Sequence, residues 1–266
     1  MPATNSPVSA VVQCVVVHVL RSAAFAGYRV AIISDFHIAP WNSTRVLADA
    51  IDTINSWEPD LVALVGDYGY SVPRFSAVSR ACYRLVLPRV TRELARLRAR
   101  DGVWAVLGNH DLDAGAEIVE PALAAVDIRV LRNSYYDIVR QTCLRIVGID
   151  DFVHANTPFD ALDDDSIPPA AVTLMLSHHP DFVLGCEHYS RRGPFIVVSG
   201  HTHGGQIALP RVGAAITLSR AATHQFPAGF VPNENATMYV TRGLGEQIPL
   251  RVGASREITL LELAQR

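Results

Sequence analysis

Lysine is absent from this sequence, because all 23 of its basic residues are arginine. This absence excludes mechanisms that need a lysine ammonium group, such as Schiff-base, P-loop and kinase chemistry. An excess of basic charge is also missing, since 26 acidic residues give a formal net charge of −3. That balance argues against nucleic acid as an obligatory partner.

Cysteine is sparse, and its four positions show no Cys-x-x-Cys spacing: Cys14, Cys82, Cys143 and Cys186. The pattern predicts neither a zinc knuckle nor a dense disulfide framework, and it favours a reducing compartment such as the cytoplasm. A long hydrophobic run is also missing. Residues 8–20 are apolar, but Gln13 and His18 interrupt them, and the run is shorter than the ~20 residues that span a bilayer. We interpret residues 14–19 as a strand rather than an export signal.

An apolar content of 49% excludes a disordered chain. Runs rich in branched residues alternate with helical segments, which predicts sheets covered by helices in a single α/β domain over residues 1–266. The central strands are expected at residues 30–34, 61–65, 103–107, 172–177 and 195–199. Further strands are expected at residues 135–139, 144–148, 238–241 and 257–263, with a loop or short helix at residues 160–169 and a loop at residues 226–232.

Two helices are expected in the first half of the chain. Apolar residues recur at helical spacing over residues 46–54, and Pro59 ends that pattern. The second helix is expected over residues 89–100, with Leu94 and Leu97 inward and several arginines close to one face. A solvated helix face is the favoured interpretation of those arginines, and a docking patch for anionic lipid or phosphate is the alternative.

The central strands share one property, which is that each ends in side chains that bind metals. Those ends are Asp35-Phe36-His37, Gly66-Asp67, Gly108-Asn109-His110-Asp111, His178-His179-Pro180 and Gly200-His201-Thr202-His203. Ligands of α/β proteins gather beyond the carboxyl ends of the strands, so these side chains are expected to meet at one place.

The donor types and their number indicate a dinuclear metal centre. One residue separates Asp35 from His37, and one separates His201 from His203. On an extended backbone the two side chains of each pair would point to the same side. Carboxylate, amide and imidazole donors without thiolates suit Mn, Fe or Zn. Seven donors exceed the needs of one ion, whereas two ions ~3.5–4 Å apart that share a carboxylate would use them all in phosphate-ester hydrolysis.

Each motif alone has an ordinary structural interpretation. Asp-x-His after a strand is commonly a turn or a cap, Gly-Asp is a default turn, and Gly-Asn-His-Asp can be a tight loop. Their joint occurrence, each after a buried strand, favours function. The spacing does not choose between His178 and His179 as a ligand.

With these motifs, which span residues 35 to 203, the sequence resembles the calcineurin-like metallophosphoesterase superfamily. The strings Leu176-Ser177-His178-His179-Pro180-Asp181 and Thr241-Arg242-Gly243-Leu244-Gly245 resemble the bacterial branch that hydrolyses lipid head groups. The resemblance implies a two-sheet β-sandwich flanked by helices. It also implies in-line hydrolysis of phosphate esters without a covalent enzyme intermediate.

The resemblance also implies a role for each residue. One ion would be held by Asp35, His37 and His203, the other by Asn109, His178 and His201, and Asp67 would bridge them. His110 would not be a ligand but would stabilise the phosphoryl oxygens or protonate the leaving alkoxide, and Asp111 would orient it. The sequence departs from the branch where Tyr68-Gly69-Tyr70 follows Asp67, since a second acid is often found there.

The expected substrate is a small-molecule or lipid phosphate ester, a phosphodiester or a phosphomonoester. The alternatives are a pyrophosphatase acting on a nucleotide-linked lipid precursor and a non-catalytic metal-binding scaffold. No obligatory protein partner is predicted, and peripheral contact with a membrane is left open. The other histidines, His18, His154, His188 and His224, are interpreted as surface or structural residues, with His154 or His224 lining the cleft as the alternative.

Overall fold

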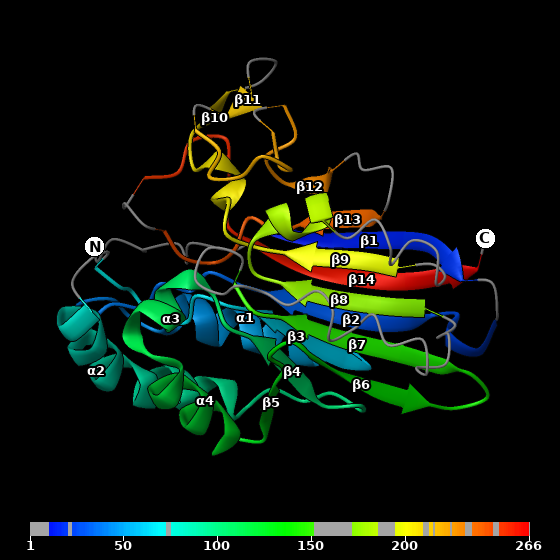
Figure 1. The fold of residues 1–266 in the computed structure, drawn as a ribbon, viewed down its shortest axis with the longest axis horizontal. Coiled ribbons are helices and arrows are strands. Elements are labelled where there is room, and N and C mark those ends of the chain that lie inside the picture. Colours follow the sequence, from blue (N-terminus) through cyan, green and yellow to red (C-terminus); the bar gives the residue numbers. More distant parts are fainter. Residues whose placement is uncertain are drawn as a thin grey trace, which may run out of the picture.

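The computed structural model describes residues 11–20, 23–72, 76–151, 172–185, 195–209, 213–214, 216–223, 225–231, 236–246 and 250–265. Within these residues two six-stranded sheets pack against each other, and helices cover the outer face of the first sheet (Figure 1). The predicted α/β fold with two sheets flanked by helices is therefore confirmed.

The first sheet has the strand order β1-β14-β2-β3-β4-β5. Its strands are β1 (Val11–Leu20), β14 (Glu257–Gln265), β2 (Tyr28–Ile33), β3 (Leu61–Val65), β4 (Val103–Val106) and β5 (Ile128–Val130). Strands β2 to β5 are mutually parallel, and β14 runs antiparallel to β2. The carboxyl ends of β2, β3 and β4 consequently lie at one edge.

The second sheet has the order β12-β13-β9-β8-β7-β6. Its strands are β12 (Gly229–Val231), β13 (Thr237–Val240), β9 (Phe195–Ser199), β8 (Val172–Ser177), β7 (Cys143–Ile149) and β6 (Ser134–Val139). Strands β7, β8, β9 and β13 are parallel. A small hairpin, β10 (Ala208–Leu209) with β11 (Gly213–Ala214), stands apart from both sheets at the top of Figure 1.

Strand β3 shows why its residues form a fully buried strand. All five of its side chains are buried, because one face of the sheet meets the helices and the other meets the second sheet. Val62 and Leu64 belong to the core under the helices, whereas Leu61, Ala63 and Val65 belong to the core between the sheets. Burial on both faces is what makes such strands continuously apolar.

The helices are α1 (Arg45–Ser56), α2 (Ser76–Leu94), α3 (Asn109–Ala114) and α4 (Ala116–Ala124), with short 3-10 turns η1 (Ala23–Phe25), η3 (Pro180–Gly185) and η5 (His203–Gly205). Helix α1 buries the apolar face that the sequence predicted. No helix among the described residues is long and apolar enough to cross a membrane.

The helix predicted over residues 89–100 is wrong at both ends. Helix α2 begins at Ser76 and ends at Leu94. It contains Pro88, which has no backbone N–H to donate to the carbonyl one turn earlier in the helix. Pro88 is exposed, so water can reach that carbonyl. Beyond Leu94 the Asn55 side chain donates to the Arg96 carbonyl at 2.8 Å and accepts from the Arg98 amide at 2.9 Å. These two bonds hold the following segment in a non-helical turn.

The arginines of this region are paired with local groups. Arg96 contacts Asp52 and Glu93, and Arg100 lies 2.5 Å from Asp60. Arg89 donates to the carbonyls of residues 40 and 42 on the neighbouring loop. Because these arginines are already engaged in local contacts, the contacts favour the solvated face over a docking patch for anions.

Several further predictions concern loops and isolated histidines. The loop expected over residues 226–232 is partly wrong, since β12 occupies Gly229–Val231 and pairs with β13. His18 is exposed, and its Nδ1 lies 3.0 Å from the Gln265 carbonyl oxygen. The loop or short helix predicted at residues 160–169 lies outside the described residues, as do His154, His188 and His224.

Candidate metal centre

The five predicted strand ends meet at one place, although their strands belong to different sheets. Asp35, Asp67 and Asn109 follow β2, β3 and β4 of the first sheet, whereas His178 and the His201 segment follow β8 and β9 of the second. Hydrogen bonds join the two edges directly. The His201 amide donates to the Asp35 carboxylate at 3.2 Å, and His178 Nδ1 lies 2.7 Å from the Val65 carbonyl oxygen.

The first cluster consists of Asp35, His37 and His203, which are all buried. The Nε2 atoms of His37 and His203 lie 3.0 Å apart. Asp35 Oδ1 lies 3.6 Å from the Nε2 of His203 and 3.8 Å from that of His37. One cation could therefore contact all three side chains.

Asp67 lies between this cluster and the second group of donors. Its Oδ2 atom is 3.6 Å from His37 Nε2, 3.2 Å from His178 Nε2 and 3.9 Å from His110 Nε2. Its other oxygen, Oδ1, accepts the His110 backbone amide at 3.0 Å. Asp67 thus presents one carboxylate oxygen to residues from both sheets.

The second group brings Asn109, His178 and His201 together. Asn109 Oδ1 lies 3.0 Å from His201 Nδ1, and the rings of His178 and His201 are 5.2 Å apart. His178 Nδ1 donates to a carbonyl, which leaves the Nε2 lone pair facing Asp67. His179 instead accepts the Asp181 amide and stacks on His201. The geometry therefore separates the two histidines that spacing alone left equivalent.

The backbone at this centre differs from the extended form that the sequence predicted. Asp35, His37, Asp67, His201 and His203 all have positive φ, between 44° and 69°. Each such residue costs ~1–2 kcal/mol relative to ordinary conformations. The paired side chains converge because the chain turns sharply at each one, and strain of this kind concentrates at functional sites.

Two glycines, Gly66 and Gly108, allow the loops after β3 and β4 to pack closely at this centre. A Cβ atom at Gly108 would lie 2.2 Å from Asp67 Oδ1, so a side chain there would displace the carboxylate. Gly66 combines a φ of 90° with a similarly close approach to Gly108. The two glycines let the β3 and β4 loops touch.

The electrostatics of the cluster suit cation binding. Burial raises the pKa of each carboxylate, but the surrounding histidines outweigh it and hold the pKa of Asp35 and of Asp67 below the usual range. Burial lowers the pKa of His201 and of His203 to about 3, so both are neutral at pH 7. Burial also lowers the pKa of His178, but Asp67 outweighs that effect and raises it well above its ordinary value.

Buried polar atoms without partners show that the residues fit a metal. Asp67 Oδ2 and His178 Nε2 are both buried and form no hydrogen bond, although they face each other. Leaving such atoms unpaired costs ~1–3 kcal/mol each. Ionised carboxylates and the neutral imidazoles of His201 and His203 are the donor states that divalent metals require, and His178 would release its proton when it binds the metal.

Residues 28–205, more than half of the chain, match the calcineurin-like phosphoesterase family. The chain belongs to this family. It is accordingly a metal-dependent phosphoester hydrolase.

Three curated relatives cover most of this phosphoesterase. It is 28% identical to the uncharacterized metallophosphoesterase YkuE of Bacillus subtilis over 92% of this chain and 84% of that protein. It is 28% identical to phosphodiesterase YaeI of Escherichia coli over 90% and 83% of the two chains. It is 26% identical to UDP-2,3-diacylglucosamine pyrophosphatase LpxG of Chlamydia trachomatis over 88% and 83%.

Asp111 of the phosphoesterase does not orient His110, contrary to what the resemblance implied. Its carboxylate accepts the backbone amides of Asp67, Tyr68 and Gly108 at 2.7–3.0 Å and the Tyr83 hydroxyl at 2.8 Å. The reason is local, because both residues lie in α3 and consecutive helical side chains do not face each other. Asp111 instead ties the β3 and β4 loops together.

We expect Asp111→Ala to lower the free energy of unfolding by about 3–5 kcal/mol, since three buried backbone amides lose their acceptor. Urea unfolding of the chelator-treated protein measures this loss. Asp49→Ala, at an exposed position on α1, is the control and should change stability by less than ~0.5 kcal/mol. Equal stability of the two variants would contradict the role of Asp111 in tying the loops.

Ser71 contacts the Nδ1 atom of the His110 ring, and Asp113 in turn contacts Ser71. The Ser71 amide donates to His110 Nδ1 at 3.0 Å, and the Ser71 hydroxyl lies 2.8 Å from the same nitrogen. That hydroxyl donates to Asp113 Oδ2 at 2.9 Å. Sequence reasoning missed both residues, although Asp113 stands three positions after His110 on a helix.

Arg251 is a further residue that the motifs did not reveal. Its guanidinium is buried against the backbone carbonyls of Arg242 and Ala254, and its Nη2 lies 3.3 Å from His203 Nδ1. Burial lowers the pKa of Arg251 to about 10, so it remains charged at pH 7. Because 48 residues separate it from His203, no local pattern could have identified it.

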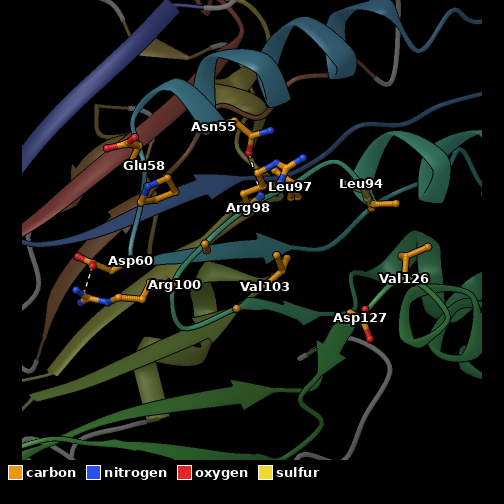
Figure 2. A pocket seen from close by; sticks show the side chains of 14 residues that line it. Asn55, Glu58, Asp60, Leu94, Leu97, Arg98, Arg100, Val103, Val126 and Asp127 are labelled. Carbon is orange, nitrogen blue, oxygen red and sulfur yellow. Dashed lines mark hydrogen bonds and ion pairs between the residues drawn. The ribbon is translucent and has the colours of Figure 1, made fainter.

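Two cavities differ in their relation to the centre. One of about 520 Å³ shares His37 as part of its wall and is lined by Trp41, Tyr70 and Leu244. A larger cavity of about 800 Å³ lies elsewhere (Figure 2). Its lining residues Asp60 and Gly102 precede β3 and β4, so it lies at the amino ends of the strands, away from the metal centre.

Proposed function

We propose that this phosphoesterase hydrolyses phosphate esters with two divalent ions. The residues Asp35, His37 and His203 would hold one ion, Asn109, His178 and His201 the other, and Asp67 would bridge them. The observation that carries the proposal is the unpaired Asp67 Oδ2, which lies 3.6 Å from His37 Nε2 and 3.2 Å from His178 Nε2. A carboxylate oxygen at this position could contact a cation in either group of ligands.

The donor set of carboxylates, an amide and imidazoles favours Mn, Fe or Zn at these positions. Such ions supply Lewis-acid charge that activates water and stabilises the phosphoryl oxygens. The protein's own contribution would include His110, whose buried ring turns its Nε2 atom toward Asp67. From there it could donate a hydrogen bond to a phosphoryl oxygen or a proton to the leaving alkoxide.

One experiment tests the proposal as a whole. Metal analysis of the purified protein is combined with hydrolysis assays on a generic phosphomonoester and a generic phosphodiester under added Mn, Zn or Fe. Two equivalents of metal with metal-dependent turnover would support the proposal. One equivalent in the fully active protein would contradict the dinuclear centre, and failure to hydrolyse either ester would contradict the function.

Two features favour a substrate with an apolar part. The cavity beside His37 has apolar and aromatic residues in its wall beside polar and charged ones, and Trp41 there keeps 74% of its surface exposed while its ring lies 6.0 Å from that of Tyr70. Phe226 is also exposed, at 43%, and it precedes Pro227, whose carbonyl accepts the Thr202 hydroxyl between His201 and His203. Exposed aromatic groups beside a polar centre are typical of ligand-binding sites.

We expect a phosphodiester or diphosphate with an apolar tail to be hydrolysed with at least ~10-fold higher kcat/KM than DNA, RNA or a phosphoserine peptide, since each buried methylene contributes ~0.8 kcal/mol. Short-chain phosphatidylglycerol, an oligonucleotide and a phosphopeptide are compared at equal metal loading. Trp41→Ala should reduce the preference, and Tyr135→Ala, at an exposed aromatic residue of β6, is its control.

A preference for the oligonucleotide would contradict this substrate class and indicate a nuclease, and a preference for the phosphopeptide would indicate a protein phosphatase.

The second candidate function is a pyrophosphatase acting on a nucleotide-linked lipid precursor. The relative LpxG, named as a pyrophosphatase, favours it. Faster cleavage of a lipid-linked diphosphate than of the diester would select that candidate.

We also propose that the chain forms a single domain, that it acts in the cytoplasm and that it has no obligatory protein partner.

A further inference from the structure

The His110 ring has two ends with different surroundings. Its Nε2 faces Asp67 Oδ2 at 3.9 Å, inside the metal centre. Its Nδ1 faces the loop after β3, where the Ser71 amide and hydroxyl lie at 3.0 Å and 2.8 Å. Ser71 is completely buried, so this contact is shielded from water. The ring orientation is therefore set from the Nδ1 side.

A backbone amide always carries its proton, so the Nδ1 atom that receives it acts as an acceptor. In a neutral imidazole only one nitrogen bears hydrogen, which here places the hydrogen on Nε2. A protonated Nε2 donates hydrogen bonds and does not coordinate a metal. This contact distinguishes His110 from His178, whose Nδ1 donates to a carbonyl and whose Nε2 is free to coordinate.

Asp113 extends this contact by one residue. Its Oδ2 accepts the only proton of the Ser71 hydroxyl at 2.9 Å, so this bond anchors the segment that carries the Ser71 amide rather than donating to Nδ1. Because α3 begins at Asn109, His110 and Asp113 stand three residues apart on one helix, the spacing at which side chains share a face. The chain lacks an acid at positions 68–71 after Asp67, and the carboxylate comes from α3 instead.

We propose that Ser71 and Asp113 are positioning residues that hold His110 with its Nε2–H toward the reacting phosphate. This proposal rests on the proposed function, in which His110 assists hydrolysis. Neither residue belongs to the candidate metal ligands, so both act through His110. Their loss lowers kcat and leaves bound metal and KM nearly unchanged.

The test combines kinetics with epistasis. Ser71→Ala and Asp113→Ala are each expected to lower kcat roughly 10-fold, the lower end of the effect of residues that orient active-site groups. Asp113→Asn keeps an acceptor for the hydroxyl and should restore most of the turnover. In a His110→Ala background, neither Ser71→Ala nor Asp113→Ala should lower kcat further. An equal loss in both backgrounds would overturn the proposal, as would loss of metal.

Ser79→Ala is the matched control, because Ser79 is equally buried and its hydroxyl bonds the Val72 backbone rather than His110. It should keep wild-type kcat, and a drop equal to that of Ser71→Ala would overturn the proposal by showing a general effect on the loop. Nitrogen-15 NMR of the His110 ring provides a readout independent of turnover. A wild-type ring protonated on Nδ1 would overturn the positioning proposal, whereas an inactive enzyme with the Nε2–H ring would refute only the proposed function.

Discussion

Asp67→Asn is expected to lower the metal content of both sites at once and to reduce turnover at least ~10²-fold. The substitution preserves size but replaces a carboxylate oxygen with an amide, which halves the donors and removes the charge. The wild-type Oδ2 lies 3.6 Å from His37 Nε2 and 3.2 Å from His178 Nε2, so both groups lose the same partner. Metal-to-protein ratios after gel filtration and hydrolysis of a generic diester measure the two effects.

Asp137→Asn is the control for this experiment, since Asp137 lies on β6 and binds Arg145 at 2.7 Å. It should retain metal and turnover. Two equivalents of metal with wild-type turnover in Asp67→Asn would remove the bridging assignment. Loss of a single equivalent would assign Asp67 to one ion alone.

His110→Ala is expected to separate catalysis from metal binding. The variant should keep both equivalents of metal and lose roughly 10²-fold or more in kcat, the usual effect of removing a positioned acid or charge stabiliser. The reason is that the His110 Nε2 atom is 3.9 Å from Asp67 Oδ2, farther than that of His178, and its Nδ1 accepts the Ser71 amide.

The competing assignment makes His110 a metal ligand. His37, Asp67 and His110 also lie close enough together to hold one ion. Loss of one metal equivalent in His110→Ala would establish that role and refute ours. Metal analysis and kcat are therefore measured on the same preparation, with unfolding by urea to confirm that the variant is folded.

The sequence determined where the central strands lie and which side chains follow them. Strands β3, β8 and β9 have the predicted bounds, because burial on both faces requires the continuous apolar runs that are visible locally. The donors after those runs could be named for the same reason. Helix α2 could not be placed, because contacts from Asn55 on another helix determine where it ends.

Only the tertiary structure decided how these donors meet. Strand pairing joins distant segments, so the sequence did not reveal that β2, β3 and β4 lie in one sheet and β8 and β9 in the other. Nor did alternation predict the positive φ values of Asp35 and His37, since these turns are stabilised by the packed centre. The contact of Ser71 with His110 spans 39 residues, and such a contact exists only once β3 and α3 have packed together.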